Sequence, residues 1–304
     1  MKLRCNRAWA SMGVCLGLLV VCAPAAEIRK AQQYPEVEAK LKPLAKPLTK
    51  PEPQDWLPNH KEAGQTFKQY LAADPVRRGR DGVAIYIVLL GDFTPEQTRI
   101  LKATEKYLEV FYQVPVKIQK EIPIADIPER GKRQHPPFGE QILTTYILDE
   151  VLKPERPKDA LAYLAFTASD LFPEPSWNFV FGQAKLHDRT GVWSIARLGD
   201  PAESKAAFQL CLRRTLHTAS HETGHILTIQ HCTAFDCNMN GVNNLDEADR
   251  KPLTMCPVCL RKVCWNLQVD PPTYLSQLEG FCREHELREE ADWYRRAGEA
   301  LAKK

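Results

Sequence analysis

The chain has 304 residues, with 41 basic and 38 acidic side chains that give a net charge of +3. This length allows one large domain or two modest ones with a real core, and it does not choose between them. The nearly balanced charge gives no reason to expect nucleic acid or an acidic membrane surface as a partner.

The first 25 residues have the pattern of a secretory signal peptide. Basic residues come first, an apolar stretch follows and small residues close the segment, in the order Lys2, Arg4 and Arg7, then Ala8 to Val21, then Ala23-Pro24-Ala25. We therefore expect cleavage before Ala26 and an exported protein, periplasmic or secreted. An uncleaved membrane anchor is the alternative, although fewer than about 18 clean apolar residues is short for a span. A lipoprotein signal at Cys22 is weaker, because Val21 precedes it.

Loss of this leader changes the charge and the cysteine count. All three of its charges are basic, so 38 basic and 38 acidic side chains remain. Three of the ten cysteines also leave, and seven remain. We expect the mature chain to be a monomer with no nucleic-acid partner and no stable membrane embedding.

Residues 26–59 are rich in lysine and proline and show neither a helical nor a strand period, as in Lys40-Leu41-Lys42-Pro43-Leu44-Ala45-Lys46-Pro47. This composition predicts an extended linker or arm. An inhibitory propeptide is the alternative, but the segment has no cysteine that could act as a switch.

The first strong strand is predicted over Val83 to Leu90, an apolar run suited to a strand buried on both faces. Thr94 then occupies the position of an N-cap, with Pro95 at the first helical position and Gln97 three residues after the cap. The helix that follows has one apolar face, made of Ile100, Leu101, Thr104, Leu108 and Phe111. The two elements form a βα unit.

Further elements alternate over the next residues. Four more strands are predicted, over Val114 to Ile122, Ala160 to Phe166, Asn178 to Leu186 and Val192 to Leu198. A polar loop is predicted over Pro128 to Gly139, a helix over Gln141 to Leu152 and one long helix over Phe208 to Gln230. The alternation predicts an α/β (α+β) fold with a five-stranded sheet.

The long helix ends in a dense group of metal-binding side chains, the run His221-Glu222-Thr223-Gly224-His225-Ile226-Leu227-Thr228-Ile229-Gln230-His231-Cys232. His221 and His225 are four residues apart, so a helix places both imidazoles on one face, one turn apart. His231 is six residues further on, so the helix has to end near Thr228 to Gln230 and the chain has to turn back. The three histidines predict a catalytic zinc site with a fourth position for water.

Glu222 follows the first histidine and projects toward the open side of this site. An HExxH pattern alone also occurs by chance, with histidines that are only buried or solvated, but the third histidine and the nearby cysteines favour a metal site. Zinc lowers the pKa of a bound water to about 7. We therefore predict hydrolysis with Glu222 as general base and later as proton donor to the leaving group.

Four cysteines directly downstream predict a second, structural zinc. They form a Cys-x4-Cys pair followed by Cys-Pro-Val-Cys, and are Cys232, Cys237, Cys256 and Cys259. This thiolate spacing is typical of a closed tetrahedral site. The alternative is a pair of disulfides or scattered core cysteines, but a disulfide within Cys-x-x-Cys is strained. We expect two zinc ions in each chain.

The segment from His221 to Cys259 resembles the archaemetzincins, zinc-dependent metalloproteases of the metzincin clan that add a four-cysteine zinc site to the active site. In that family's pattern a HExxHxxGxxHC core is followed by Cys-x-Met and then by CxxC, and this chain has Cys237-Asn238-Met239 and Cys256-Pro257-Val258-Cys259. The resemblance implies that Met239 is the Met-turn residue, an apolar floor under the catalytic zinc. It covers about residues 55 to 285, with matches at Trp56-Leu57, Glu62 to Tyr70, Ser169 to Phe172, Asn178 to Ala184 and Asn240 to Arg261.

The resemblance also implies an architecture and a reaction, the hydrolysis of peptide bonds in peptide or protein substrates. Residues 60–231 would form an upper catalytic subdomain with a mixed, twisted sheet, and residues 232–304 a smaller, mostly helical lower subdomain stapled by zinc. The strand near Phe179 to Ala184 would be the sheet edge above the cleft, where it could hold a peptide by backbone pairing. An ordinary edge strand is the alternative.

The chain departs from the family pattern at two points. Thr228 stands where the usual pattern has glycine, at the turn that brings His231 round, and a β-branched residue does not adopt positive φ cheaply. Either the turn is made with negative φ, or a strained threonine is tolerated. Sixteen residues separate Met239 from Cys256, about one fewer than expected, which a loop absorbs.

After Cys259 the chain is predicted to be helical over Lys262 to Leu267 and from Tyr274 to Lys304, the last part being a solvated amphipathic helix. A partner-binding helix is the alternative. Three cysteines are left over, Cys211, Cys264 and Cys282, and we favour buried thiols over a pair between the last two.

Two other functions stay open. The chain could be a zinc protein that binds peptides without useful turnover, which the departure at Thr228 makes conceivable. It could also be a nucleic-acid binder built on the four cysteines, but that leaves the HExxH motif and the leader unexplained. Because Cys232 follows His231 directly, the structural zinc is expected to help hold the third histidine in place.

Overall fold

The structure is a computed structural model that describes residues 33–136 and 139–303. From Tyr34 onward the chain forms one compact unit. The predicted signal peptide, residues 1–25, lies outside the described residues. None of the helices that the structure describes combines the length and the apolar character that a bilayer crossing requires.

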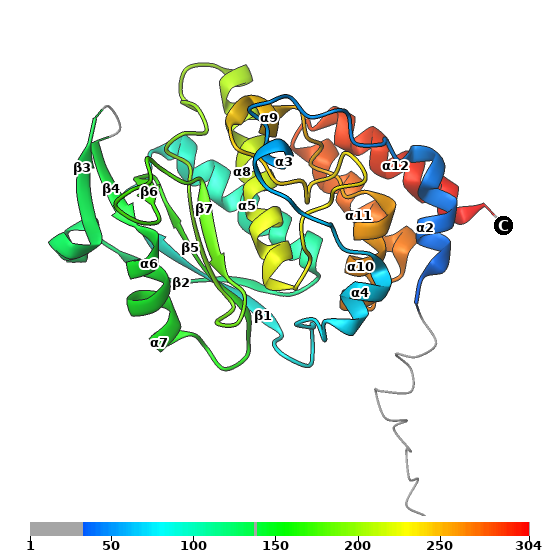
Figure 1. Cartoon of the computed structure of the whole chain (residues 1–304), viewed down its shortest axis with the longest axis horizontal. Helices are drawn as coiled ribbons and strands as arrows, with labels where there is room; N and C mark the ends of the chain where they lie inside the picture. Colours follow the sequence, from blue (N-terminus) through cyan, green and yellow to red (C-terminus); the bar gives the residue numbers. More distant parts are fainter. Residues whose placement is uncertain (1–32, 137–138, 304) are drawn as a thin grey trace, which may run out of the picture. The chain divides into compact units, whose positions relative to one another are not determined.

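A five-stranded sheet lies among the helices of this unit, as Figure 1 shows. Its strands lie in the order β2-β1-β5-β8-β7. The first four run parallel and β7 runs antiparallel to β8 at the edge, with bounds Ala84–Leu90 (β1), Val116–Ile122 (β2), Ala160–Thr167 (β5), Gly182–Lys185 (β7) and Thr190–Ser194 (β8). Every residue of β5 is buried, as expected for a central parallel strand. The predicted α/β fold with a mixed five-stranded sheet is confirmed.

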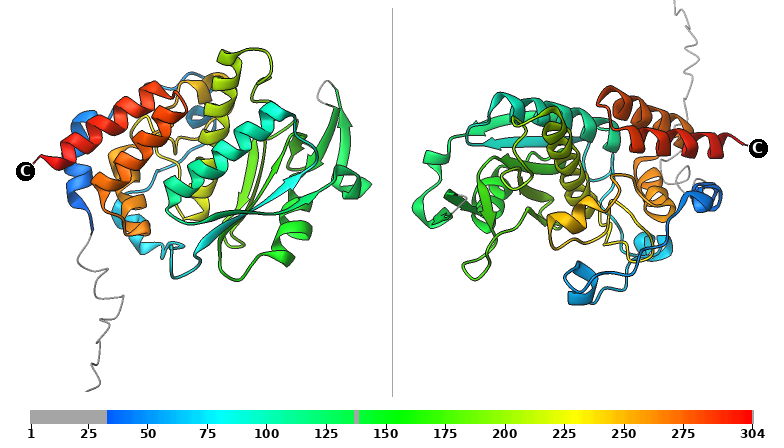
Figure 2. Two further views of the ribbon diagram at one scale, coloured as in Figure 1. Left: turned by 180° about the vertical axis from the view of Figure 1, so that it is seen from behind. Right: turned by 90° about the horizontal axis from the view of Figure 1, so that it is seen from above.

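Helices cover both faces of this sheet. α5 (Pro95–Tyr112) and α8 (Lys205–Ile226) pack against one face, as seen from behind in Figure 2. The other face packs on α6 (Thr144–Tyr146), a π-helical stretch η4 (Ile147–Leu152) and α7 (Lys153–Glu155). α5 begins with the predicted capping box, in which the Thr94 side chain accepts from Gln97 N and Gln97 accepts from Thr94 N.

A second, three-stranded sheet contradicts two predictions. It contains β3 (Lys132–His135), β4 (Gly139–Leu143) and β6 (Asp170–Phe172) in the order β3-β4-β6. The polar loop predicted over Pro128 to Gly139 therefore includes a strand, and the helix predicted over Gln141 to Leu152 begins only at Thr144. Short 3-10 turns η2 (Ile124–Asp126) and η3 (Glu129–Gly131) precede the sheet. The polar strand β3 carries no apolar alternation, so only its pairing with β4 fixes it.

Three other boundaries differ from prediction. The strand expected over Asn178 to Leu186 is ordered as β7 only from Gly182, and Val180 makes an isolated bridge with Leu171. The strand expected to reach Leu198 ends at Ser194. α8 begins three residues earlier than predicted, where the Ser204 side chain caps it, and it ends at Ile226.

The C-terminal region is helical, as predicted. It contains α9 (Leu245–Asp249), α10 (Pro257–Leu267), α11 (Pro271–Glu284) and α12 (Arg288–Ala302), drawn from gold to red in Figure 1. α11 and α12 form an antiparallel pair. Cys211, Cys264 and Cys282 are buried free thiols, so the described residues contain no disulfide and the favoured prediction is confirmed.

The segment predicted to be an extended linker is instead docked and partly helical. It contains α2 (Pro35–Leu41), the 3-10 turn η1 (Lys42–Leu44) and α3 (Trp56–Asn59), and α4 (Phe67–Ala72) follows it. α2 packs against α10 and α12, with Val37 and Leu41 fully buried. Further on, Pro47 forms an antiparallel bridge with Phe235. Burial of two apolar side chains one helical turn apart offsets the weak helix propensity of this lysine- and proline-rich sequence.

Candidate active site

The three predicted histidines converge at the end of α8. One ring nitrogen of each of His221, His225 and His231 lies within 4.8 Å of the others. The Nε2 atoms of His221 and His225 are 2.9 Å apart. α8 ends at Ile226, and the chain turns back through Thr228 to bring the third ring to the first two.

The other nitrogen of each ring faces an acceptor. His221 Nδ1 lies 2.8 Å from the Asn238 carbonyl oxygen, His225 Nδ1 lies 2.7 Å from the Ile229 carbonyl oxygen, and His231 Nδ1 lies 2.9 Å from the Glu62 carboxylate. These acceptors have no proton to give, so each Nδ1 donates and each Nε2 keeps its lone pair. Burial lowers the pKa of His225 to about 4 and that of His221 well below its usual value, the neighbouring histidines adding to the shift.

This arrangement fits a divalent cation. Three neutral imidazoles whose lone pairs point at one another repel unless a cation lies between them. Bonds of about 2.0 to 2.1 Å in a tetrahedral site put nitrogen atoms roughly 3.3 Å apart, close to the observed separation. The described histidines thus match a three-histidine zinc site.

Glu222 projects into the cleft in front of this site. The cleft has a volume of about 750 Å³ and is lined by Glu222, the three histidines and residues of β7 and its preceding loop. Within residues 33–136 and 139–303 no group donates a hydrogen bond to the Glu222 carboxylate, and burial raises its pKa to about 7. An unpartnered carboxylate beside a metal site is suited to accept a proton from water.

Met239 lies under the helix turn that carries the motif. It is fully buried, and a Cβ atom added at Gly224 would lie 2.7 Å from its sulfur. Gly224 therefore allows Met239 to approach the backbone between the two helical histidines. The position agrees with the floor that the family resemblance implies for Met239.

The departure at Thr228 is resolved by a left-handed threonine. Its φ is 70°, so the turn keeps the geometry that glycine usually supplies. The Thr228 hydroxyl accepts a hydrogen bond from Val76 N at 3.2 Å, and its carbonyl accepts one from Gln65 Nε2 at 3.1 Å. Contacts from the segment before β1 thus stabilise a strained residue at the point where the chain turns toward His231.

The four predicted cysteines also converge. The sulfur atoms of Cys232, Cys237, Cys256 and Cys259 all lie within 4.8 Å of one another, and all four residues are buried. Cys232 Sγ is 3.7 Å from Cys256 Sγ, against about 3.8 Å for a tetrahedral zinc with bonds of 2.3 Å. Cys237 Sγ accepts a hydrogen bond from Cys256 N, and thiol hydrogen bonds, first from Cys237, lower the pKa of Cys232. The donor set fits a closed zinc site.

Some site residues come from segments that sequence reasoning did not assign to the site. Glu62 contacts His231, and the Trp56 ring lies edge-on to His231 with centroids 5.3 Å apart. Both precede β1, so about 170 residues of chain separate them from the motif, and only their family resemblance marked them. Arg133 of β3 donates to the carbonyls of Pro175, Trp177 and Asn178, which fixes the loop above the cleft.

His217 is a fourth histidine of α8 in the cleft wall, one turn before His221. Its ring stacks on that of His221 with centroids 6.0 Å apart. Its Nε2 is buried with no partner among the described residues, and burial lowers its pKa to about 3. The spacing of four residues was the available signal, and the prediction did not use it.

Comparison with known proteins decides the family. Residues 157–264 match the model of peptidase family M54. Archaemetzincin-2 of Homo sapiens is 33% identical over 253 residues, which cover 71% of this chain and 69% of that protein. The chain belongs to the archaemetzincin family. It is therefore a metallopeptidase, as the resemblance of its motifs predicted.

Two archaeal archaemetzincins agree with this assignment. The archaemetzincin of Thermococcus kodakarensis is 36% identical over 138 residues, which cover 44% of this chain and 72% of that protein. The crystal structure of archaemetzincin from Methanopyrus kandleri matches with a TM-score of 0.50 and 29% identity, covering 63% of this chain and 99% of that chain. Both similarities agree with membership of the archaemetzincin family.

Proposed function

We propose that this archaemetzincin hydrolyses peptide bonds with Glu222 as general base and with two zinc ions per chain. His221, His225 and His231 would hold the catalytic ion, and the four cysteines the structural one. The observation that carries the proposal is the convergence of three Nε2 lone pairs beside an unpartnered carboxylate. When bound, the catalytic zinc lowers the pKa of water to about 7 and polarises the scissile carbonyl.

The chain's own residues supply the remaining steps. Glu222 accepts a proton from the attacking water and passes it to the leaving amine. The backbone carbonyls of Asn238 and Ile229 and the Glu62 carboxylate hold the three imidazoles in one orientation. The edge strand β7 offers unpaired backbone groups along the cleft, to which an extended peptide can add as a further strand.

Replacement of the carboxylate tests the proposal. Glu222→Gln should keep both metal equivalents and lower the cleavage of a quenched peptide library at least about 100-fold. Glu203→Gln, an exposed carboxylate just before α8, is the control and should cleave like the parent. Metal is counted by mass spectrometry and cleavage by fluorescence, with and without a chelator. Equal cleavage by Glu222→Gln and the parent would contradict the assignment.

A peptide-binding protein without turnover is no longer favoured by the departure at Thr228. That alternative rested on a displaced third histidine, and His231 lies with the other two in spite of the threonine. A parent protein that binds the library but never cleaves it would restore the alternative.

We also propose that residues 1–25 direct export. The support is the sequence alone: basic residues, an apolar stretch and small residues before Ala26. N-terminal sequencing of protein from the extracytoplasmic fraction is expected to begin at Ala26. Recovery of an intact N-terminus there would favour the membrane-anchored alternative.

A further inference from the structure

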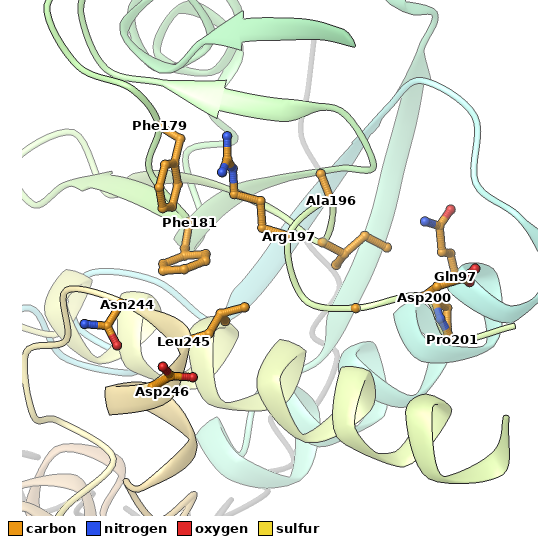
Figure 3. Close-up of a pocket in the computed structure, with 12 residues that line it drawn as sticks. Gln97, Phe179, Phe181, Ala196, Arg197, Asp200, Pro201, Asn244, Leu245 and Asp246 are labelled. Carbon is orange, nitrogen blue, oxygen red and sulfur yellow. The ribbon is translucent and has the colours of Figure 1, made fainter. Parts of the chain in front are cut away.

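A second cavity opens beside the catalytic cleft. It has a volume of about 600 Å³ and shares the lining residues Phe179, Phe181 and Leu245 with the cleft, so the two cavities are neighbours. Figure 3 shows the two phenylalanines on one side of the opening, Leu245 and Asp246 on the other, and Asp200 at the far end. A peptide lying along β7 would pass from the cleft to this cavity, because Phe179 and Phe181 come just before that strand.

The aromatic wall of the cavity is held rigidly. The rings of Phe179 and Phe181 meet edge to face with centroids 5.2 Å apart. The guanidinium of Arg197 lies 3.8 Å from the centre of the Phe179 ring. Two nitrogens of Arg197 bind the buried carboxylate of Asp170, at 2.9 and 2.7 Å. The Arg197 charge is thereby balanced by a carboxylate, and the arginine acts as a support for the ring.

The remaining charges of the cavity are negative. Asp200 and Asp246 line it, and neither carboxylate forms an ion pair with any lysine, arginine or histidine of the described residues. The two arginines of the neighbouring cleft wall differ, because Arg213 pairs with Glu290 and Arg214 with Asp249. The charge of Asp246 also acts on Arg214, whose own ion pair is with Asp249. A ligand therefore meets apolar walls and two carboxylates that form no ion pair within the described residues.

We propose that this cavity is a substrate subsite for the side chain of a lysine or arginine that does not flank the scissile bond. The inference rests on the proposed peptidase function. The aliphatic part of the substrate side chain packs on Phe179, Phe181 and Leu245, and its charged end lies in the field of Asp200 and Asp246. The enzyme is accordingly selective for extended, basic peptides, since a short peptide cannot fill the cleft and the cavity together.

A matched pair of peptides tests the subsite. Quenched peptides that carry one lysine, moved along an alanine-rich frame, are compared with the same peptides carrying norleucine, which keeps the aliphatic stem and lacks the charge. At one position not adjacent to the scissile bond, kcat/KM for lysine should exceed that for norleucine by about three- to ten-fold, as charge pairs with the two exposed carboxylates allow. The preference should shrink in 0.5 M salt.

Charge-neutralising variants assign the preference to the cavity. In the double variant Asp200→Asn with Asp246→Asn the ratio of kcat/KM for lysine to norleucine should fall toward one. The control removes two exposed carboxylates elsewhere, Glu121→Gln on the opposite sheet edge with Asp126→Asn, and should leave the ratio as in the parent. Equal cleavage of both peptides by the parent, or a preference that survives the double substitution, would overturn the proposal.

Binding separates this proposal from the peptidase function itself. Fluorescence anisotropy with the Glu222→Gln variant measures affinity for the same peptides without turnover. A lysine preference in binding that the Asp200 and Asp246 substitutions abolish supports the subsite. This holds even if the parent cleaves none of the peptides, because absence of cleavage would contradict only the proposed hydrolysis. Cleavage without any lysine preference in binding contradicts only the subsite.

Discussion

The three histidines and the four cysteines are neighbours in the sequence, yet their surroundings differ. The histidine site opens to a cleft of about 750 Å³, and its outermost pair, His231 and Glu62, has side chains that are 17% and 29% exposed. The four cysteines are all buried, the most exposed being Cys232 at 8%. An open site leaves room for water and substrate, whereas a closed site contributes only to folding. The comparison indicates which of the two proposed metal sites would perform the chemistry.

The two sites are also joined through one short segment. Cys232 N donates to the Met239 carbonyl at 2.7 Å, and Asn240 Nδ2 donates to the Cys232 carbonyl at 2.7 Å. The same segment supplies the Asn238 carbonyl that orients His221. A change at Cys232 should therefore reach the histidine site.

The largest expected effect is loss of the closed site. Cys256→Ser should lose one metal equivalent and lower the melting temperature by about 10 °C or more, because binding at a structural zinc site is folding free energy. Cys264→Ala is the control, since that buried thiol lies outside the cluster and its loss should keep both metals. Calorimetry and metal analysis give the two readouts. Two metal equivalents retained in Cys256→Ser would break the assignment of a structural zinc.

The link between the sites gives the next prediction. Cys232→Ser should lose both metals, since Cys232 is a proposed zinc ligand directly after His231, and without its zinc bond the segment that carries His231 is held less firmly. The measurement is metal content beside peptide cleavage. If Cys232→Ser kept one metal and normal cleavage, the histidine site would be independent of the cysteine site.

A smaller effect is expected at the orienting carboxylate of the open site. Glu62→Gln keeps the shape but weakens the hydrogen bond to His231 Nδ1, and should reduce zinc affinity and kcat/KM about 10- to 100-fold. Glu38→Gln, a carboxylate of α2 that pairs with Arg261, should leave both unchanged. Competition with a zinc chelator measures the affinity. An unchanged affinity in Glu62→Gln would show that His231 needs no orienting partner.

In both sites the sequence alone predicts the ligands better than the residues that surround them. The proposed ligands lie in short motifs. The helical spacing of His221 and His225 indicates the nitrogen ligands of one site, and the Cys-x-x-Cys pair indicates the sulfur ligands of the other. The contacts of Glu62 and Trp56 with His231 are tertiary, so no spacing rule reaches them. The sequence does not specify the φ of Thr228 for the same reason, because its partner Val76 is distant in sequence.

The fold divides in a similar way. Apolar strands such as β1 and the capped helix α5 were predicted within a few residues, since burial and capping act locally. β3 was missed because it is polar and is held by pairing with β4, and α2 was missed because its helix depends on docking against α10 and α12. Both errors concern segments whose structure comes from long-range contacts.

The smallest expected effect is at Thr228, the turn between the two sites. Thr228→Val keeps the β-branched residue at φ 70° but removes the hydroxyl that accepts from Val76 N, and should lower the free energy of unfolding by about 1 to 2 kcal/mol. Thr228→Gly loses the same hydrogen bond and gives the unfolded chain more conformational entropy, and each of these effects destabilises the folded state by about 1 kcal/mol. The glycine also relieves backbone strain, which stabilises the folded state by about 1 to 3 kcal/mol. The glycine variant should therefore unfold within about 1 kcal/mol of the parent.

Denaturant unfolding at a fixed zinc concentration compares the two variants, because zinc binding otherwise shifts the apparent stability. Both should keep the metal content of the parent, since His231 is held by Glu62 as well as by the turn. A glycine variant less stable than the valine variant would mean that the left-handed threonine carries no strain. In that case the hydrogen bond of the Thr228 hydroxyl would not be the reason why the turn tolerates threonine where the family pattern has glycine.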